Sequence, residues 1–342
     1  MVETILVRRG GGEPSRVVIG DALGELEELL PKGRRVIAVT DRNLVQCQGG
    51  LTGRFENIVI GLGERIKNLT TIERVCQELA RMGADRESYI VGIGGGIVTD
   101  VAGFAASVYM RGMRFGFVAT SLLAQVDASV GGKNGVNFDG YKNLVGTFNQ
   151  PDFVICDAGL LATLPEREFR AGLAEIIKAG VIADASLFEL FERHTLRDFL
   201  CDNDLLARAI IAAVRVKAQI VEWDEREAGD RRLLNLGHTF AHAVEKRSRR
   251  YVHGEAVAIG MALICAVSQK LCGLSANEAG RIVAVLRKMG LPTECNIPPE
   301  KLLSAVRLDK KRDQDAVNLI LVNETGRCEV RRTPYSELPG LI

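Results

Sequence analysis

The 342-residue sequence lacks several features that would each place it in a particular class of protein. Its net charge is only +1, so there is no global attraction to nucleic acids or anionic membranes. No apolar run has the length expected of a bilayer span, and the N-terminal residues carry charges where a signal peptide needs an apolar core. The eight cysteines are scattered and form no CxxC pair, a pattern typical of reduced thiols. We therefore expect a cytoplasmic protein with neither a nucleic-acid nor a membrane partner.

The first half of the chain has the pattern of an α/β domain. Apolar and charged residues make up 47% and 25% of the chain, as in an ordinary globular enzyme, and its length favours two domains. Short apolar runs alternate with helical patterns, which predicts a mainly parallel sheet with ligands beyond the carboxyl ends of its strands. Strands are predicted at 34–40, 57–63, 88–96, 114–120 and 152–157, and helices at 70–82 (capped by Asn68, Thr70 or Thr71), 97–110 and 121–130.

After Asp157 the pattern becomes helical. An apolar stripe predicts a helix over 205–225, and Ser275 could cap another that ends near Gly290. The runs 317–322 and 328–332 predict a terminal hairpin. The fold class is therefore predicted to be α/β, with a mostly helical second domain.

Histidines are few, but three of the four lie in one short stretch. On a helix His238 and His242 lie on one face, one turn apart, and His253 opens a second apolar helix. Imidazole is the commonest metal ligand and the natural acid–base group near neutral pH. Three unrelated histidines, each hydrogen-bonded in a core, would give the same pattern, so this stretch alone leaves the choice open.

A glycine-rich turn, GIGGGIVTD at 92–100, joins a predicted strand to a predicted helix. Its backbone N–H groups could contact a phosphate, although Ile97 stands where GxGxxG needs its third glycine. A tight turn packed against a helix is the alternative. Asp100 could be a cap or bind a ligand hydroxyl, and Glu64 and Lys67 could contact a nucleotide or be loop charges.

Charged residues also lie in unusual places. The small-residue stretch 120–148 holds Asp127, Lys133, Asn134, Lys142 and Asn143, with Arg111 just upstream; lysine suits phosphate or carboxylate, and a solvated loop is the alternative. Glu175 in an apolar helix could pair with Lys178, or bind a metal beside His238 and His253 as in catalytic zinc sites. Further cations are Lys217, Arg231, Lys310 and Lys311. Together these residues predict a nucleotide turn, a metal site and cations for a small molecule with two anionic groups.

Over essentially its whole length the chain resembles the 3-dehydroquinate synthases, a family of the sugar-phosphate cyclases. The matching stretches are GGGIVTDVAGF, LLAQVDASVGGK, YKNLVGTFNQP, GLAEIIK, NLGHTFAHA, HGEAVAIGM and LDKK. The resemblance implies an NAD-binding α/β domain over 1–157, a mostly helical metal- and substrate-binding domain over 158–342, an active site between them and a homodimer.

The implied reaction belongs to the shikimate pathway to aromatic amino acids. It converts 3-deoxy-D-arabino-heptulosonate 7-phosphate to 3-dehydroquinate and phosphate. A hydroxyl is oxidised by NAD, phosphate is eliminated, the ketone is reduced back, the ring opens, and an intramolecular aldol step closes the carbocycle.

The resemblance also implies roles for individual residues. It places Zn²⁺ or Co²⁺ on Glu175, His238 and His253, and His242 near the phosphate, where it would assist proton transfer. Lys178 would lie close to the reacting hydroxyls, and Arg111 would reach the neighbouring subunit's site. Lys133, Asn143, Asn235 and Lys310 would bind the phosphate end, and Lys217 and Arg231 the carboxylate. The positions that match for NAD are Asp41, Asn43, Glu64, Lys67, Gly95, Gly96, Ile97 (through its backbone), Asp100, Thr120, Ser121, Asp127 and Lys142.

Three departures from the family concern packing and cofactor affinity more than chemistry. No glycine precedes Asp100, VATS lacks a proline and two threonines, and Ala241 replaces a glycine between two histidines. The alternatives are another sugar-phosphate cyclase, a metal-dependent polyol dehydrogenase, which would need fewer cations, and an inactive paralogue that only binds ligands.

Overall fold

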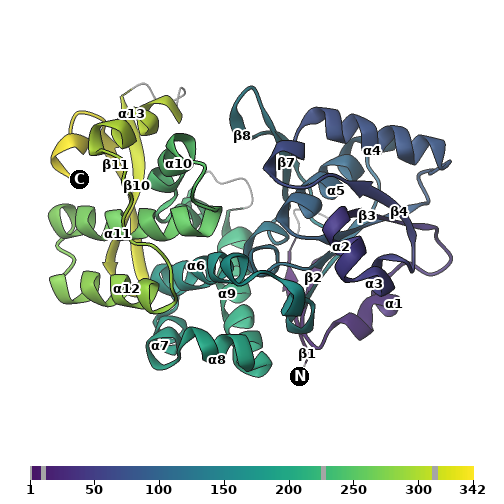
Figure 1. Ribbon diagram of the computed structural model, residues 1–342, viewed down its shortest axis with the longest axis horizontal. Helices are drawn as coiled ribbons and strands as arrows, with labels where there is room; N and C mark the ends of the chain where they lie inside the picture. Colours follow the sequence, from purple (N-terminus) through teal and green to yellow (C-terminus); the bar gives the residue numbers. More distant parts are fainter. Residues whose placement is uncertain (1, 9–12, 225–228, 310–314) are drawn as a thin grey trace. The chain divides into compact units, whose positions relative to one another are not determined.

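The computed structural model describes residues 2–8, 13–224, 229–309 and 315–342. The chain divides into two compact units, Met1–Pro165 and Glu166–Ile342. In Figure 1 the first runs from purple to teal and the second from teal to yellow.

The first unit is built on a seven-stranded sheet in the order β1-β2-β9-β6-β5-β3-β4. Only β1 is antiparallel to its neighbour, so the predicted mainly parallel sheet is confirmed. The strands are β1 (Val2–Val7), β2 (Ser15–Gly20), β3 (Val36–Asp41), β4 (Glu56–Ile60), β5 (Tyr89–Gly94), β6 (Phe115–Ala119) and β9 (Phe153–Asp157).

Helices cover both faces of this sheet, as the continuous apolar strands require. Every residue of β5 is buried. Gly92 faces α5, since a Cβ on it would lie 2.9 Å from Ala102 Cβ. Tyr89 points to the opposite face by strand alternation and stacks on Phe153, with ring centroids 6.2 Å apart. The helices are α1 (Leu26–Leu29), α2 (Arg42–Cys47), α3 (Gly49–Thr52), α4 (Leu69–Arg81) and α5 (Gly96–Val108), and Asn68 caps α4.

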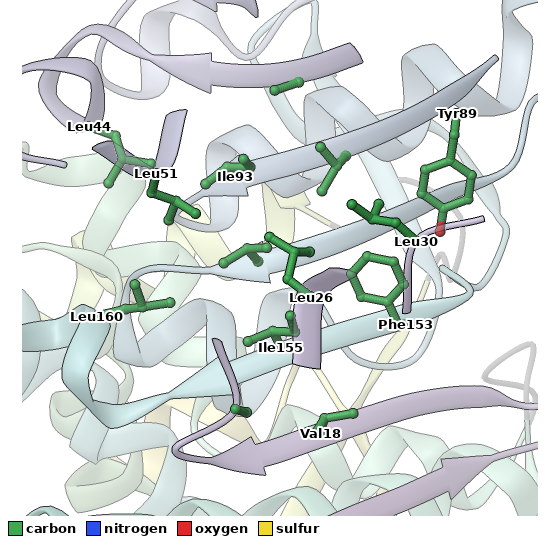
Figure 2. Packing of buried hydrophobic residues seen from close by; sticks show 14 residues of the cluster. Val18, Leu26, Leu30, Leu44, Leu51, Tyr89, Ile93, Phe153, Ile155 and Leu160 are labelled. Carbon is green, nitrogen blue, oxygen red and sulfur yellow. The ribbon is translucent and has the colours of Figure 1, made fainter. Parts of the chain in front are cut away.

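The core on the Tyr89 face is shown in Figure 2. Leu26 and Leu30, at α1, pack in one cluster with Tyr89, Phe153 and Ile155. Burying side chains of this size stabilises the fold by about 1.5–3 kcal/mol each.

Two hairpins were not predicted from the sequence. The first is β1–β2, the edge of the large sheet. The second pairs β7 (Lys133–Phe138) with β8 (Tyr141–Phe148) across Asp139-Gly140, both at positive φ. Asp-Gly is the signal of a two-residue type I′ turn, but most of the strand that follows is exposed, so its apolar alternation is weak. The helix predicted at 121–130 spans 122–128 and is π-helical over Ala124–Ala128.

The second unit is mostly helical, as predicted. Ser275 caps α12 through Glu278 N, and the terminal hairpin is present. Its elements are α6 (Glu166–Ala183), α7 (Ala185–Arg193), α8 (Leu196–Cys201), α9 (Asn203–Trp223), the 3-10 helix η6 (Asp230–Asn235), α10 (His238–Arg247), α11 (His253–Leu271), α12 (Ala276–Lys288), α13 (Pro299–Asp309), β10 (Ala316–Glu324) and β11 (Arg327–Pro334).

Helix α11 corrects one expectation from the sequence. With 19 residues and a mean hydropathy of 1.3, it is long and apolar enough to cross a membrane, alone among the described helices. However, 61% of this segment is buried inside the fold, where α11 contacts α6, α10, α12 and β10. It is therefore the core helix of the second unit.

Candidate functional site

Three helices of the second unit bring Glu175, His238 and His253 together. Glu175 lies in the middle of α6, His238 is the first residue of α10, and His253 is the first residue of α11. One ligand atom from each lies within 4.8 Å of the others. His253 Nε2 is 3.5 Å and His238 Nε2 is 3.9 Å from Glu175 Oε1. The structure thus joins residues that are 78 positions apart in sequence, counting from Glu175 to His253.

Glycines allow these helices to approach closely enough for the cluster to form. A Cβ on Gly260 would lie 2.0 Å from the carbonyl oxygen of Gly237, the residue before His238. A Cβ on Gly254, the residue after His253, would lie 2.0 Å from the carbonyl oxygen of Ala171. Backbone therefore meets backbone on both sides of α11, and any side chain there would separate the ligands. The sequence interpretation missed these contacts.

Hydrogen bonds fix which imidazole nitrogens face Glu175. His238 Nδ1 lies 3.1 Å from the carbonyl oxygen of Leu236, which can only accept, so Nδ1 carries the proton. His253 Nδ1 lies 3.2 Å from Glu245 Oε1. In each ring Nε2 is therefore the nitrogen that faces Glu175 and that a metal ion would bind, with Nδ1 held by its own partner as in metal-binding histidines. Two such nitrogens and one carboxylate are a donor set that fits Zn²⁺ or Co²⁺.

Glu175 has a second neighbour in Lys178, which forms an ion pair with its Oε2. The side chains are 1% and 4% exposed, so the charges are deeply buried. Burial lowers the pKa of His238 to about 3, with Lys178 acting in the same direction and Glu175 against it. For His253, burial is outweighed by hydrogen bonds to Glu175 and Glu245, which raise its pKa to about 10. Glu175 therefore pairs with Lys178 and also belongs to the histidine cluster, so the two alternatives predicted from the sequence are not exclusive.

The other expected residues of this unit lie on adjoining elements. His242 is one turn beyond His238, with ring centroids 5.7 Å apart. Arg231 and Asn235 lie on η6, which contacts α6 and α9, and α9 carries Lys217. Arg231 is only 1% exposed and is among the largest fully buried side chains. Lys310 and Lys311 lie outside the described residues.

In the first unit, the expected cofactor residues follow the carboxyl ends of four neighbouring strands. Lys67, after β4, forms an ion pair with Asp100 of α5. Burial raises the pKa of Asp100 to about 6, although Lys67 acts in the opposite direction. Asp41 caps α2 by accepting from Leu44 N at 2.9 Å. The remaining expected residues are Asn43 in α2, Glu64 after β4, Gly95, Gly96 and Ile97 after β5, and Thr120, Ser121 and Asp127 after β6.

The hairpin β7–β8 carries Lys133, Lys142 and Asn143. It also carries Asn137, which the sequence did not indicate as a functional residue. Asn137 Nδ2 donates to Glu64 Oε1 at 2.6 Å, and its Oδ1 accepts from Asn143 N at 2.9 Å. Asn137 N also donates to the carbonyl of Lys67 at 2.9 Å. Asn143 itself has φ 50°, a conformation that asparagine tolerates better than most residues. One side chain thus joins the loop after β4 to the hairpin.

Two further residues from the sequence analysis, Arg111 and Asn134, also lie in this unit. Arg111 has φ 68° and follows Met110 at φ 51°, so two consecutive non-glycine residues adopt the left-handed region. Asn134 is buried and donates to the carbonyls of Gly132 (3.0 Å) and Asn149 (2.7 Å), a structural role within the hairpin.

Comparison with known proteins shows the family to which the chain belongs. Residues 57–171 match the family model described as 3-dehydroquinate synthase N-terminal, and residues 172–312 match 3-dehydroquinate synthase C-terminal. The chain belongs to the 3-dehydroquinate synthase family. It is 44% identical to the 3-dehydroquinate synthase of Halorhodospira halophila, over 80% of this chain and 78% of the relative. It is 41% identical to that of Koribacter versatilis, over 92% and 88%.

A solved structure extends the 3-dehydroquinate synthase comparison to the fold. The 2-epi-5-epi-valiolone synthase from Streptomyces hygroscopicus, with NAD⁺ and Zn²⁺ bound, superposes with a TM-score of 0.87. The two chains are 28% identical, and the match covers 98% of this chain and 97% of the other. The expected dehydroquinate synthase-like fold is therefore confirmed.

Proposed function

We propose that this protein is a 3-dehydroquinate synthase, a phosphate-eliminating cyclase that converts 3-deoxy-D-arabino-heptulosonate 7-phosphate to 3-dehydroquinate and phosphate. One observation carries the proposal: a chain of this family places Glu175, His238 and His253 within 4.8 Å of one another. A polyol has no anionic group for the buried Arg231 to bind, which favours a cyclase over a polyol dehydrogenase.

The proposal includes NAD and Zn²⁺ or Co²⁺ as cofactors. Glu175, His238 and His253 would hold the metal ion. When bound, NAD would accept a hydride transiently, and the ion would polarise the hydroxyl that is oxidised. Support comes from the donor set itself and from the valiolone synthase relative, whose structure contains NAD⁺ and Zn²⁺.

For the substrate, we assign the chain's cations to its two anionic ends. Lys217 and Arg231 would bind the carboxylate, and burial of both side chains strengthens such a charged contact. The phosphate end is assigned to Lys133, Asn143, Asn235 and Lys310. Lys178 would lie beside the reacting hydroxyls, and Arg111 would complete the site of a second subunit.

His242 is assigned to proton transfer. It lies on the same face of α10 as His238, one turn further from the cluster of Nε2 atoms. An imidazole there can take up and return a proton while His238 holds the ion.

The NAD assignment uses residues after four neighbouring strands, together with Lys142 on the hairpin β7–β8. They are Asp41, Asn43, Glu64, Lys67, Gly95, Gly96, Ile97, Asp100, Thr120, Ser121, Asp127 and Lys142. The glycine turn at the start of α5 is supported by its geometry, because backbone N–H groups at a helix N-terminus favour a phosphate. Residues 1–157 would thus form the NAD-binding domain and residues 158–342 the metal- and substrate-binding domain.

The test is a phosphate-release assay with the heptulosonate phosphate. We expect phosphate and 3-dehydroquinate without net NADH, loss of activity after chelation, and recovery with Zn²⁺ or Co²⁺. Steady accumulation of NADH would contradict the cyclase assignment and favour a polyol dehydrogenase.

A second candidate is a related cyclase that acts on a sugar phosphate without a carboxylate. The structural similarity to a 2-epi-5-epi-valiolone synthase supports testing this candidate. Assays with several sugar phosphates separate the two. If Arg231 binds a carboxylate, Arg231→Ala should cost roughly 2–5 kcal/mol in kcat/KM with the heptulosonate phosphate.

The proposal also includes a homodimer in the cytoplasm. Sedimentation of the purified protein tests the dimer. Mixing of Arg111→Ala with an inactive His242→Ala protein tests whether the two subunits share a site, because shared sites restore activity in part of the mixed dimers.

A further inference from the structure

Glu245 is a buried carboxylate that the proposed function does not use. It lies on α10 seven residues after His238 and three after His242, so all three share one helical face. Its side chain is 7% exposed. A carboxylate in such a place is costly unless charged or polar groups compensate for the lost water.

Its Oε1 lies 3.2 Å from His253 Nδ1. On the other side of the same ring, His253 Nε2 lies 3.5 Å from Glu175 Oε1. The imidazole is thus held between two carboxylates, one at each nitrogen. Because a carboxylate can only accept, the contact with Glu245 requires a proton on Nδ1, so Nε2 is the nitrogen through which His253 would bind a metal ion at the candidate site.

The Nδ1 atoms of His238 and His253 have different kinds of partner. His238 Nδ1 has the neutral carbonyl of Leu236, two residues away in the chain, as its partner. His253 Nδ1 has a charged carboxylate from a different helix. A carboxylate behind an imidazole makes the ring more basic and adds a negative charge near the cation, whereas a carbonyl mainly orients the ring.

We propose that Glu245 is a positioning residue for metal binding: through His253 Nδ1 it sets the tautomer and orientation of His253 and increases the affinity of the Glu175–His238–His253 site for a divalent ion. This inference rests on the proposed metal site. It predicts that the charge of Glu245, and not only its hydrogen bond, contributes to metal affinity.

A purely structural role would give a different result. The approach of α10 and α11 already has its own causes, namely the contact between Gly237 and Gly260 and the buried Phe240 and Val244. If Glu245 only added stability to this packing, its removal would lower the unfolding temperature and leave metal affinity unchanged.

The experiment compares Zn²⁺ affinity in wild type, Glu245→Gln and Glu245→Ala. Each protein is stripped of metal and titrated in competition with a chromophoric chelator, without substrate, and Co²⁺ absorption spectra report the ligand geometry. Glu245→Gln keeps an oxygen acceptor and removes the charge, while Glu245→Ala removes both. We expect affinity to fall roughly 10–100-fold, as for other residues that support a ligand, with the larger loss in Glu245→Ala.

The matched control is Glu255→Gln. Glu255 lies in the first turn of α11, accepts from Arg167 Nε at 2.7 Å and from Val252 N at 3.1 Å, and is 15% exposed. It therefore stabilises the same helix start through groups other than the imidazole. Its Zn²⁺ affinity should stay within about threefold of wild type. An affinity of Glu245→Gln within that range, or an equal loss in Glu255→Gln, would overturn the proposal.

Glu175→Gln separates this inference from the proposed function. If Glu175→Gln loses Zn²⁺ affinity and the Glu245 variants do not, only the role of Glu245 is wrong. If Glu175→Gln binds Zn²⁺ as wild type does, the metal site itself is wrong.

Discussion

The side chain of Asn137 donates a 2.6 Å hydrogen bond to Glu64 Oε1 and so joins the hairpin β7–β8 to the loop after β4. The same side chain accepts from Asn143 N at 2.9 Å. Glu64 belongs to the proposed NAD residues and Asn143 to the proposed phosphate residues. Asn137 therefore holds two binding elements in one arrangement, although it is assigned to neither ligand.

Asn137→Ala should weaken both interactions. Loss of a hydrogen bond to a charged group costs about 1–2 kcal/mol, so we expect NAD affinity to fall roughly five- to thirtyfold and KM for the sugar phosphate to rise. Titration of the protein with NAD measures the first effect. Asn323→Ala is the matched control, because Asn323 Nδ2 donates to Glu329 Oε2 at 3.0 Å in a hairpin of the other unit. Equal NAD affinities of the two variants would refute the role of Asn137.

The raised pKa of Asp100 predicts how the first unit responds to pH. Asp100 has a pKa of about 6 in the folded protein against 3.8 ordinarily, so the folded state binds its proton more tightly. Its contribution to stability is therefore fully present below pH 3.8 and is lost as pH rises through about 6, a difference of roughly 3 kcal/mol. The test is the difference in free energy of unfolding between wild type and Asp100→Asn. As pH rises from 4 to 7, the advantage of wild type should fall by roughly 3 kcal/mol.

Asp85 provides a control of opposite sign. Hydrogen bonds from the Ser88 hydroxyl and backbone lower the pKa of Asp85. Its contribution is present above pH 3.8 and is lost on acidification. If Asp85→Asn and Asp100→Asn changed the pH dependence in the same direction, the assignment for Asp100 would be wrong.

The two histidines of α10 should behave differently when each is replaced. His238→Ala removes a proposed ligand, so metal content and turnover should both fall. His242→Ala should keep its metal and lose about 10²-fold or more in phosphate release, as expected for a proton-transfer group. Metal analysis after dialysis, together with the activity assay, distinguishes the cases. Loss of metal from His242→Ala would overturn the division between them.

Gly260→Ala should damage the second unit. The added Cβ would lie 2.0 Å from the carbonyl oxygen of Gly237, so α10 and α11 must move apart. Overpacking of this kind costs about 1–3 kcal/mol or more and should also weaken Zn²⁺ binding. Gly280→Ala in α12 is the control. Nothing lies within 4 Å of its Cβ, so reduced backbone entropy of the unfolded chain should stabilise the protein by about 0.4–1 kcal/mol. Chemical denaturation measures both, and a Gly260→Ala protein as stable as wild type would contradict the packing argument.

Local patterns predicted most of the fold. The strands from β3 to β6 are continuous apolar runs between helical patterns, so their parallel sheet followed directly from the sequence. Spacing alone placed His238 and His242 on one helical face. The strand β8 was not predicted because most of its residues are exposed, even though Asp139-Gly140 is a strong hairpin signal.

Tertiary contacts could not be predicted in the same way. Glu245 is three residues after His242, yet its distance to His253 depends on how α10 and α11 pack. That packing depends on Gly260 meeting Gly237, a contact between backbones that leaves no periodic signal in the sequence. The same holds for Asn137, whose partners come from a loop and a hairpin.

The apolar helix α11 also has a consequence during protein synthesis. Two of its packing partners, α6 and α10, precede it, whereas α12 and β10 follow. A nascent chain that ends after Leu271 therefore presents a segment apolar enough for a bilayer before all of its covering elements exist. Transiently exposed apolar surface of this kind promotes aggregation and chaperone binding. The cover of this helix is therefore complete only after the ribosome has translated residues 272–324.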